Sequence, residues 1–149
     1  MIEELNKVIV QETNAIKNLL IELDEQHRCI IVNDIFGLES CVRKIKEANK
    51  NIAYMEVERR KITEGRVMMD IIDESHDSEL LKNFYKIQQL LQELVLQKNT
   101  NELLLRQGLS FTNRILNVLN PARETATYNS YGKVKNSMRW LDVRNVFNF

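Results

Sequence analysis

Apolar residues recur every three or four positions through the first 32 residues of the chain. They are Ile2, Leu5, Val8, Ile9, Ala15, Ile16, Leu19, Leu23, Ile30 and Ile31. This spacing places them on one side of an α-helix and predicts a helix over residues 2–32. Asn33 and Asp34 interrupt the pattern, and such side chains accept backbone N–H groups at helix starts. We therefore expect a turn and the N-cap of a second helix here.

The second periodic segment covers residues 35–62. Its apolar positions follow a near-heptad order and are Leu38, Cys41, Val42, Ile45, Ala48, Ile52, Met55 and Ile62. A connection as short as Asn33–Asp34 brings two helices together as an antiparallel hairpin. Residues 63–77 then break the period. Gly65 is expected to end the second helix, and the apolar run Val67–Ile72 predicts a short helix that caps one end of the bundle.

The third long helix is predicted over residues 79–120. A seven-residue repeat, typical of coiled-coil packing, links Leu80, Phe84, Ile87, Leu91, Leu94, Lys98, Asn101, Leu105, Gly108, Thr112, Ile115 and Leu119. At about 1.5 Å per residue this helix is about 60 Å long, so its C-terminal part is expected to extend past the hairpin or to pack on another chain. Lys98 and Asn101 allow two interpretations. Either they fix register as buried polar residues, or this part of the stripe faces solvent.

Pro121, the only proline, lacks a backbone N–H and ends the third helix. Residues 1–120 are expected to form the helical bundle, and residues 121–149 a hinge and a recognition tail. After Gly132 a short helix would carry one apolar, partner-binding face: Val134, Met138, Trp140, Leu141, Val143, Val146 and Phe147. Such a face is typical of helix-on-helix recognition. The alternative is that the tail packs back on the third helix and completes the core.

The pattern as a whole predicts an all-α fold, an antiparallel three-helix bundle or coiled coil with a C-terminal recognition tail. The composition agrees, since the 149 residues include only 4 glycines and 1 proline. Lys plus Arg and Asp plus Glu each total 21, and this neutral balance disfavours binding to nucleic acid or to anionic membranes. No apolar run approaches the length of a membrane span, and the N-terminus lacks the bases of a signal peptide. We expect a cytoplasmic protein.

Candidate chemistry is sparse. Cys29 and Cys41 lie almost symmetrically about the predicted turn, near His27, but they form no metal-binding motif. The expected account is two small buried side chains without a metal. The four glycines are isolated, so no phosphate-binding loop is present, and neither an enzyme nor a cofactor is expected. The basic clusters "VRKIKEANK" (42–50) and "ERRK" (58–61) are interrupted by acids, as is typical of a solvated helix face.

Residues 96–134, "LQKNTNELLLRQGLSFTNRILNVLNPARETATYNSYGKV", carry three short motifs in order. The first contains Asn99, Asn101, Leu103, Leu104 and Leu105; the second Leu109, Phe111, Asn113, Ile115 and Leu116; the third Thr127, Tyr128, Gly132 and Lys133. In order and spacing they resemble the C-terminal half of FlgN-type flagellar export chaperones. The second helix, which starts at Asp34 and has Arg59 or Arg60 in its last turns, extends the resemblance over nearly the whole chain.

The resemblance implies a cytoplasmic chaperone of flagellar type III secretion. Such a protein binds the C-terminal helices of hook–filament junction proteins (FlgK and FlgL), keeps them unassembled and delivers them to the export gate. It also implies that the segment after the third helix binds the client. A tyrosine of that segment would dock to the gate protein FlhA. By motif position this is Tyr128, and Tyr131 lies close enough to leave the assignment open between them.

Two other functions compete with this hypothesis. A structural coiled-coil adaptor would oligomerise through the third helix, as a homodimer for example, and would ignore client peptides. A nucleic-acid-associated protein would bind DNA in a salt-sensitive manner, which the neutral charge disfavours.

Overall fold

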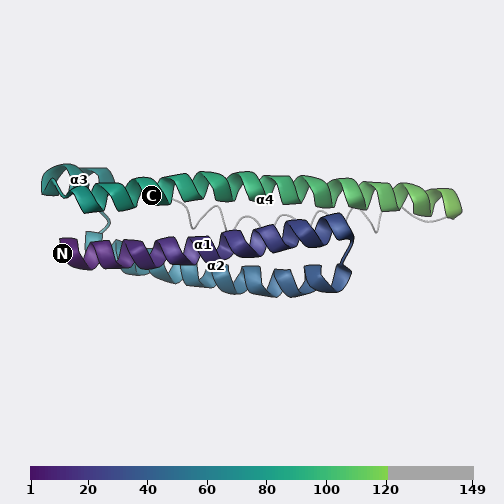
Figure 1. The fold of residues 1–149 in the computed structure, drawn as a ribbon, viewed down its shortest axis with the longest axis horizontal. Coiled ribbons are helices and arrows are strands. Elements are labelled where there is room, and N and C mark those ends of the chain that lie inside the picture. The colour runs from purple at the N-terminus through teal and green to yellow at the C-terminus, as the bar shows by residue number, and fades with distance from the viewer. Residues whose placement is uncertain (121–149) are drawn as a thin grey trace.

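The computed structural model describes residues 1–120, which form four α-helices and no strand within that range (Figure 1). Helix α1 spans Ile2–Val32, α2 Ile35–Thr63, α3 Met68–Ser75 and α4 Ser78–Leu119. The all-α prediction is confirmed for these residues. The periodic segments found in the sequence match the helices to within one residue at each end.

The turn between α1 and α2 is built as its sequence predicts. Asn33 adopts the left-handed conformation (φ 57°) that closes α1. Asp34 is the N-cap of α2, and its carboxylate accepts a hydrogen bond from the backbone N–H of Gly37 at 2.9 Å. A Cβ on Gly37 would lie only 2.6 Å from Sγ of Cys29, so the close approach of the two helices requires a glycine there. The result is an antiparallel hairpin (Figure 1).

At the opposite end, α2 closes through Glu64 rather than Gly65. Glu64 takes the left-handed conformation (φ 53°), and its N–H bonds back to the carbonyls of Arg60 and Lys61. Gly65 follows with a positive φ of 76° and continues the reversal. The predicted short capping helix is α3, whose Met68, Ile71 and Ile72 are buried and cover this end of the core.

Helix α1 is the central element of the packing. It lies against both α2 and α4, whereas α2 and α4 have few close backbone approaches to each other. The largest fully buried side chains come from all the helices: Leu5, Ile9, Ile16, Leu19, Leu23, Ile52, Met68, Ile71, Leu80, Ile87 and Leu94. Burial of each such side chain contributes about 1.5–3 kcal/mol to folding. The long helices of the predicted bundle are therefore α1, α2 and α4, with α1 shared by two helix pairs.

Lys98 and Asn101 are both buried, at 6% and 0% exposure. The interpretation in which this part of the α4 stripe faces solvent is therefore wrong. The remaining interpretation, a buried polar pair that sets register, is developed below.

Candidate helix-binding surface

Asn101 is the last buried residue of α4. The helix continues for 18 more residues, Glu102–Leu119, and extends beyond the end of the α1–α2 hairpin (Figure 1). We call this segment the α4 overhang. Its extension past the hairpin is what the length of the third helix predicts.

A polar layer at Asn101 fixes where the overhang begins. The side-chain amide of Asn101 donates to the carbonyl of Leu23 at 2.8 Å and to Oε1 of Gln26 at 3.0 Å. Its Oδ1 lies 2.9 Å from Nε2 of Gln97 and 3.2 Å from Nδ1 of His27. All four hydrogen-bonding positions of the amide are used. Any slip of α4 along α1 would break these bonds, so the layer holds α4 in one register.

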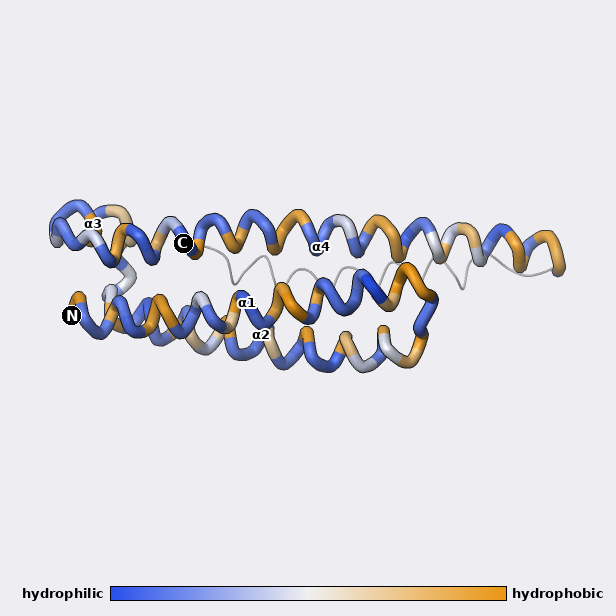
Figure 2. Tube along the Cα trace, in the orientation of Figure 1, coloured by the Kyte–Doolittle hydropathy of each residue, from blue (hydrophilic) through white to orange (hydrophobic). Residues whose placement is uncertain are grey.

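The overhang is amphipathic, with an apolar half and a polar half of its circumference. At 100° per residue, the apolar residues from Leu104 to Leu119 fall within about 180° of the helix. They are Leu104, Leu105, Leu109, Phe111, Ile115, Leu116, Val118 and Leu119. The opposite half carries Arg106, Gln107, Ser110, Asn113, Arg114 and Asn117. Figure 2 shows apolar residues recurring along α4 as far as its C-terminal end. A stripe at least 100° wide normally faces a core.

Within residues 1–120, this apolar half is largely uncovered, with Leu104, Leu105 and Leu116 half-buried. Phe111 is 64% exposed and Val118 is 80% exposed, and no residue of the overhang is buried. The charged side chains beside it are already engaged in part, since Arg106 pairs with Glu102 at 2.6 Å. The overhang is thus a bare apolar surface of the kind that marks a site of protein association.

A second apolar surface lies where the overhang begins. The hairpin tip, which we define as Ile31, Val32, Ile35 and Phe36, has all four side chains exposed, and Phe36 reaches 85%. Because His27 is level with Asn101, α1 ends about five residues further on, beside the start of the overhang. A helix laid on the overhang in line with α1 would meet the hairpin tip with its end.

Sequence reasoning missed a buried ion pair between the hairpin helices. Nε of Arg59 donates to Oε2 of Glu12 at 3.0 Å, and their side chains are only 4% and 1% exposed. Burial raises the pKa of Glu12 above its usual 4.5, and the Arg59 guanidinium opposes the rise. The interpretation of "ERRK" as a solvated face is therefore wrong for Arg59. The available signal was that Glu12 and Arg59 each fall on an apolar stripe of their helix.

The thiols near the hairpin turn are buried and free. Burial, with the neighbouring Cys29 thiol, raises the pKa of the Cys41 thiol to about 11, so it is protonated and weakly nucleophilic at neutral pH. His27 bonds to Asn101. Residues 1–120 hold no group of three or more His, Cys, Asp or Glu side chains that could bind a metal ion.

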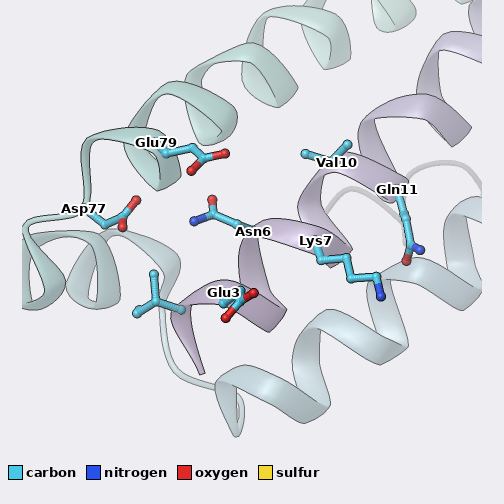
Figure 3. Close-up of a pocket in the computed structure, with 8 residues that line it drawn as sticks. Glu3, Asn6, Lys7, Val10, Gln11, Asp77 and Glu79 are labelled. Atoms are coloured by element: carbon cyan, nitrogen blue, oxygen red, sulfur yellow. The ribbon is translucent and has the colours of Figure 1, made fainter.

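A shallow groove at the opposite end lies between the starts of α1 and α4 (Figure 3). Glu3, Lys7 and Glu79 line it together with Asn6 and Asp77. Two of these side chains have structural roles. Asp77 accepts the N–H of Leu80 at 2.7 Å as the N-cap of α4, and Asn6 bonds to Asn83 at 3.1 Å. The groove is open, and Asp77 and Asn6 serve the packing of the helices.

In the described part of the chain, no helix is both long and apolar enough to cross a membrane. A scan against protein families matches the FlgN protein family over residues 1–136. The chain belongs to the FlgN family. The match includes the overhang and the first 17 residues after it. Members of this family are flagellar export chaperones, and the family binds hook–filament junction proteins. No curated protein and no solved structure matches the chain.

The predicted site residues of this FlgN-family chain fall outside the described residues. This holds for the client-binding residues Val134, Met138, Trp140, Leu141, Val143, Val146 and Phe147. It also holds for the two candidate gate-docking residues, Tyr128 and Tyr131. Within residues 1–120 the candidate surface consists of the α4 overhang and the hairpin tip. The sequence pattern predicted that the end of the third helix extends past the hairpin or packs on another chain, but it predicted neither region as a binding surface.

Proposed function

We propose that this FlgN-family chain is a cytoplasmic chaperone that binds the C-terminal helical region of FlgK- or FlgL-like hook–filament junction proteins. By covering that region it prevents premature assembly, and it delivers the client to the export gate. The observation that carries the proposal is the bare apolar half of the α4 overhang, since an amphipathic client helix can bury its own apolar face there.

The overhang suits one helix of limited length. About 13 of its 18 residues lie beyond the end of α1 and extend about 20 Å, which matches three to four turns of a client helix. Phe111 and Val118, seven residues apart, lie on the same side of the overhang and supply large anchors for such a helix. The hairpin tip would contact the end of the client helix and set how far it slides along α4. Binding of this kind requires no cofactor and no catalytic group.

Residues 121–149 complete the proposed site. We assign client contacts in this segment to Val134, Met138, Trp140, Leu141, Val143, Val146 and Phe147, whose aromatic and methionine side chains are common anchors of helix recognition. The segment follows the overhang directly, so both parts can engage one client at the same time.

The test is co-purification with a C-terminal fragment of a FlgK- or FlgL-like protein. Phe111→Ser with Val118→Ser should weaken binding at least tenfold, and deletion of residues 121–149 should abolish it while helical content of residues 1–120 persists. Leu96→Ser is the matched control, because Leu96 is a 68% exposed leucine of α4 that lies before the overhang. Unchanged binding by both altered proteins would refute the proposed site.

Delivery to the gate has its own test. We propose that Tyr128 docks to the gate protein FlhA, with Tyr131 as the other candidate. Tyr128→Ala should retain the client and lose binding to the cytoplasmic domain of FlhA, whereas Tyr131→Ala should retain both. Loss with Tyr131→Ala alone would transfer the role to that residue, and loss with neither would remove it from both.

The exposed overhang also favours a second function, a structural adaptor that oligomerises through α4. Light scattering of the purified protein distinguishes the two. A stable homodimer whose mass does not change when the client fragment is added would support the adaptor and contradict the chaperone.

A further inference from the structure

The apolar half of the α4 overhang has small side chains at two positions near its middle, Gly108 and Thr112. Leu109 and Phe111 lie toward its borders, and Ile115 and Leu119 continue the middle line toward the C-terminus. A Cβ built on Gly108 would meet no atom within 4 Å. Glycine inside a helix costs about 1 kcal/mol relative to alanine. The space above Gly108 therefore fits a bulky side chain that comes from outside residues 1–120.

The C-terminal segment of the same chain carries bulky side chains at helical spacing. In a helix, Trp140, Val143 and Phe147 share one side. Val134, Met138 and Leu141 share the opposite side. This divides the single apolar face expected from the sequence into two. A helix that is apolar on opposite sides can pack one side against a surface and leave the other side for a partner.

The lengths of the two segments agree. Residues 134–147 would form a helix of about 21 Å, and the part of the overhang from Leu105 to Leu119 has the same length. The 14 residues between Leu119 and Val134 exceed the 2–8 residues that usually connect antiparallel helices. The tether also keeps the segment at an effective concentration in the millimolar range at the overhang.

We propose that in the client-free protein residues 134–147 dock as a helix, antiparallel to α4, on the apolar half of the overhang. Trp140, Val143 and Phe147 contact the overhang, with an aromatic ring over Gly108. Val134, Met138 and Leu141 then face outward, and a client that binds the overhang displaces the docked helix. Only this last statement rests on the proposed function; the docking itself requires no client.

The test uses the fluorescence of Trp140, the only tryptophan, in the full-length protein without client. Emission should be blue-shifted and protected from acrylamide relative to the protein in denaturant. Phe111→Ser should remove most of the shift and the protection. Gly108→Leu should do the same while raising helix propensity, so loss of helix would not explain the result. Leu96→Ser should leave both signals unchanged. Emission and quenching equal to those of the denatured wild-type chain would overturn the proposal.

Dilution separates docking within one chain from docking between two copies. An intramolecular contact gives the same Trp140 emission over a hundredfold range of protein concentration, and a red shift on dilution would overturn it. The Trp140 experiments and the client-binding experiment can fail separately. An exposed Trp140 together with Phe111-dependent client binding would reject the docking alone, and a protected Trp140 without client binding would reject the chaperone alone.

Discussion

The two parts of α4 have the same apolar repeat and opposite surroundings. From Ser78 to Asn101 the stripe is buried against the hairpin, mostly against α1, and in the overhang the same stripe is bare within residues 1–120. Leu94 and Ile115 occupy equivalent heptad positions, three repeats apart, and are 0% and 43% exposed. An amphipathic period therefore indicates that a helix has a partner. Whether the partner belongs to the same fold depends on where the neighbouring helices end.

The largest expected effect comes from a substitution that destabilises the helix packing and leaves the overhang unchanged. Arg59→Met removes one partner of the buried pair with Glu12 and leaves a carboxylate without its counter-charge in the interior. The free energy of unfolding should fall by about 3–5 kcal/mol, as measured by urea denaturation. Arg60→Met, which alters an exposed side chain next to it, should cost less than about 1 kcal/mol. Equal losses from the two substitutions would contradict the structural role of the pair.

The second prediction tests the two parts of α4 directly. Leu94→Ala creates a cavity in the core and should lower the free energy of unfolding by about 2–5 kcal/mol. Ile115→Ala changes the equivalent position of the overhang and should lower it by less than about 0.5 kcal/mol in the same experiment, since the surface there is not part of the core. A loss as large as that from Leu94→Ala would mean that the overhang is part of the core rather than a surface on which a separate helix docks.

The helices themselves were predictable from the sequence because each has a long period and a clear start. Asp34 and Asp77 are the N-caps of α2 and α4, and both are residue types that favour this position. The overhang was also predictable, because the length of α4 exceeds that of either hairpin helix. The ends and the apolar face of an amphipathic helix are determined by its own residues, so they can be predicted from the local sequence.

Specific contacts between helices were not predictable. Glu12 and Arg59 are 47 residues apart, and only the register of the hairpin brings them together. Their positions on apolar stripes indicate that they are buried, but many acids and bases of this chain could have been the partner. Likewise the sequence shows that Asn101 is a polar residue on the apolar stripe of α4. Its hydrogen bond to the Leu23 carbonyl, in contrast, depends on how α4 packs on α1.

The third prediction concerns the boundary between the two parts of α4. Asn101→Leu removes four hydrogen bonds and leaves the Gln26 amide and His27 ring without this partner in a buried layer. We expect a loss of about 1–3 kcal/mol in the free energy of unfolding, because the apolar gain of leucine offsets part of the lost bonding. Asn99→Leu, an exposed neighbour on the same helix, is the control and should be nearly neutral. A stabilised Asn101→Leu protein would show that the layer sets register at a cost in stability.

The smallest expected effect is a pH dependence of the free energy of unfolding that comes from Glu12. Burial raises the pKa of Glu12 above 4.5, so between 4.5 and the raised value the folded protein holds a proton at Glu12 that the unfolded chain has released. The free energy of unfolding therefore decreases as pH rises through this window, by at most about 1.4 kcal/mol for each pH unit. Glu12→Gln cannot titrate and lacks this contribution.

Urea denaturation of wild type and Glu12→Gln between pH 7 and pH 4.5 measures the effect as a difference between two curves. As pH falls, the free energy of unfolding of the wild type should rise relative to that of Glu12→Gln. Protonation removes the cost of burying the Glu12 carboxylate, even though Arg59 stabilises its charge. A fall in the relative free energy of unfolding as pH falls would mean that the ion pair with Arg59, and not burial, determines the direction of the Glu12 pKa shift. Phe111→Ser should give a pH profile parallel to that of the wild type, because the overhang lies far from Glu12 and contributes nothing to the interior of the bundle.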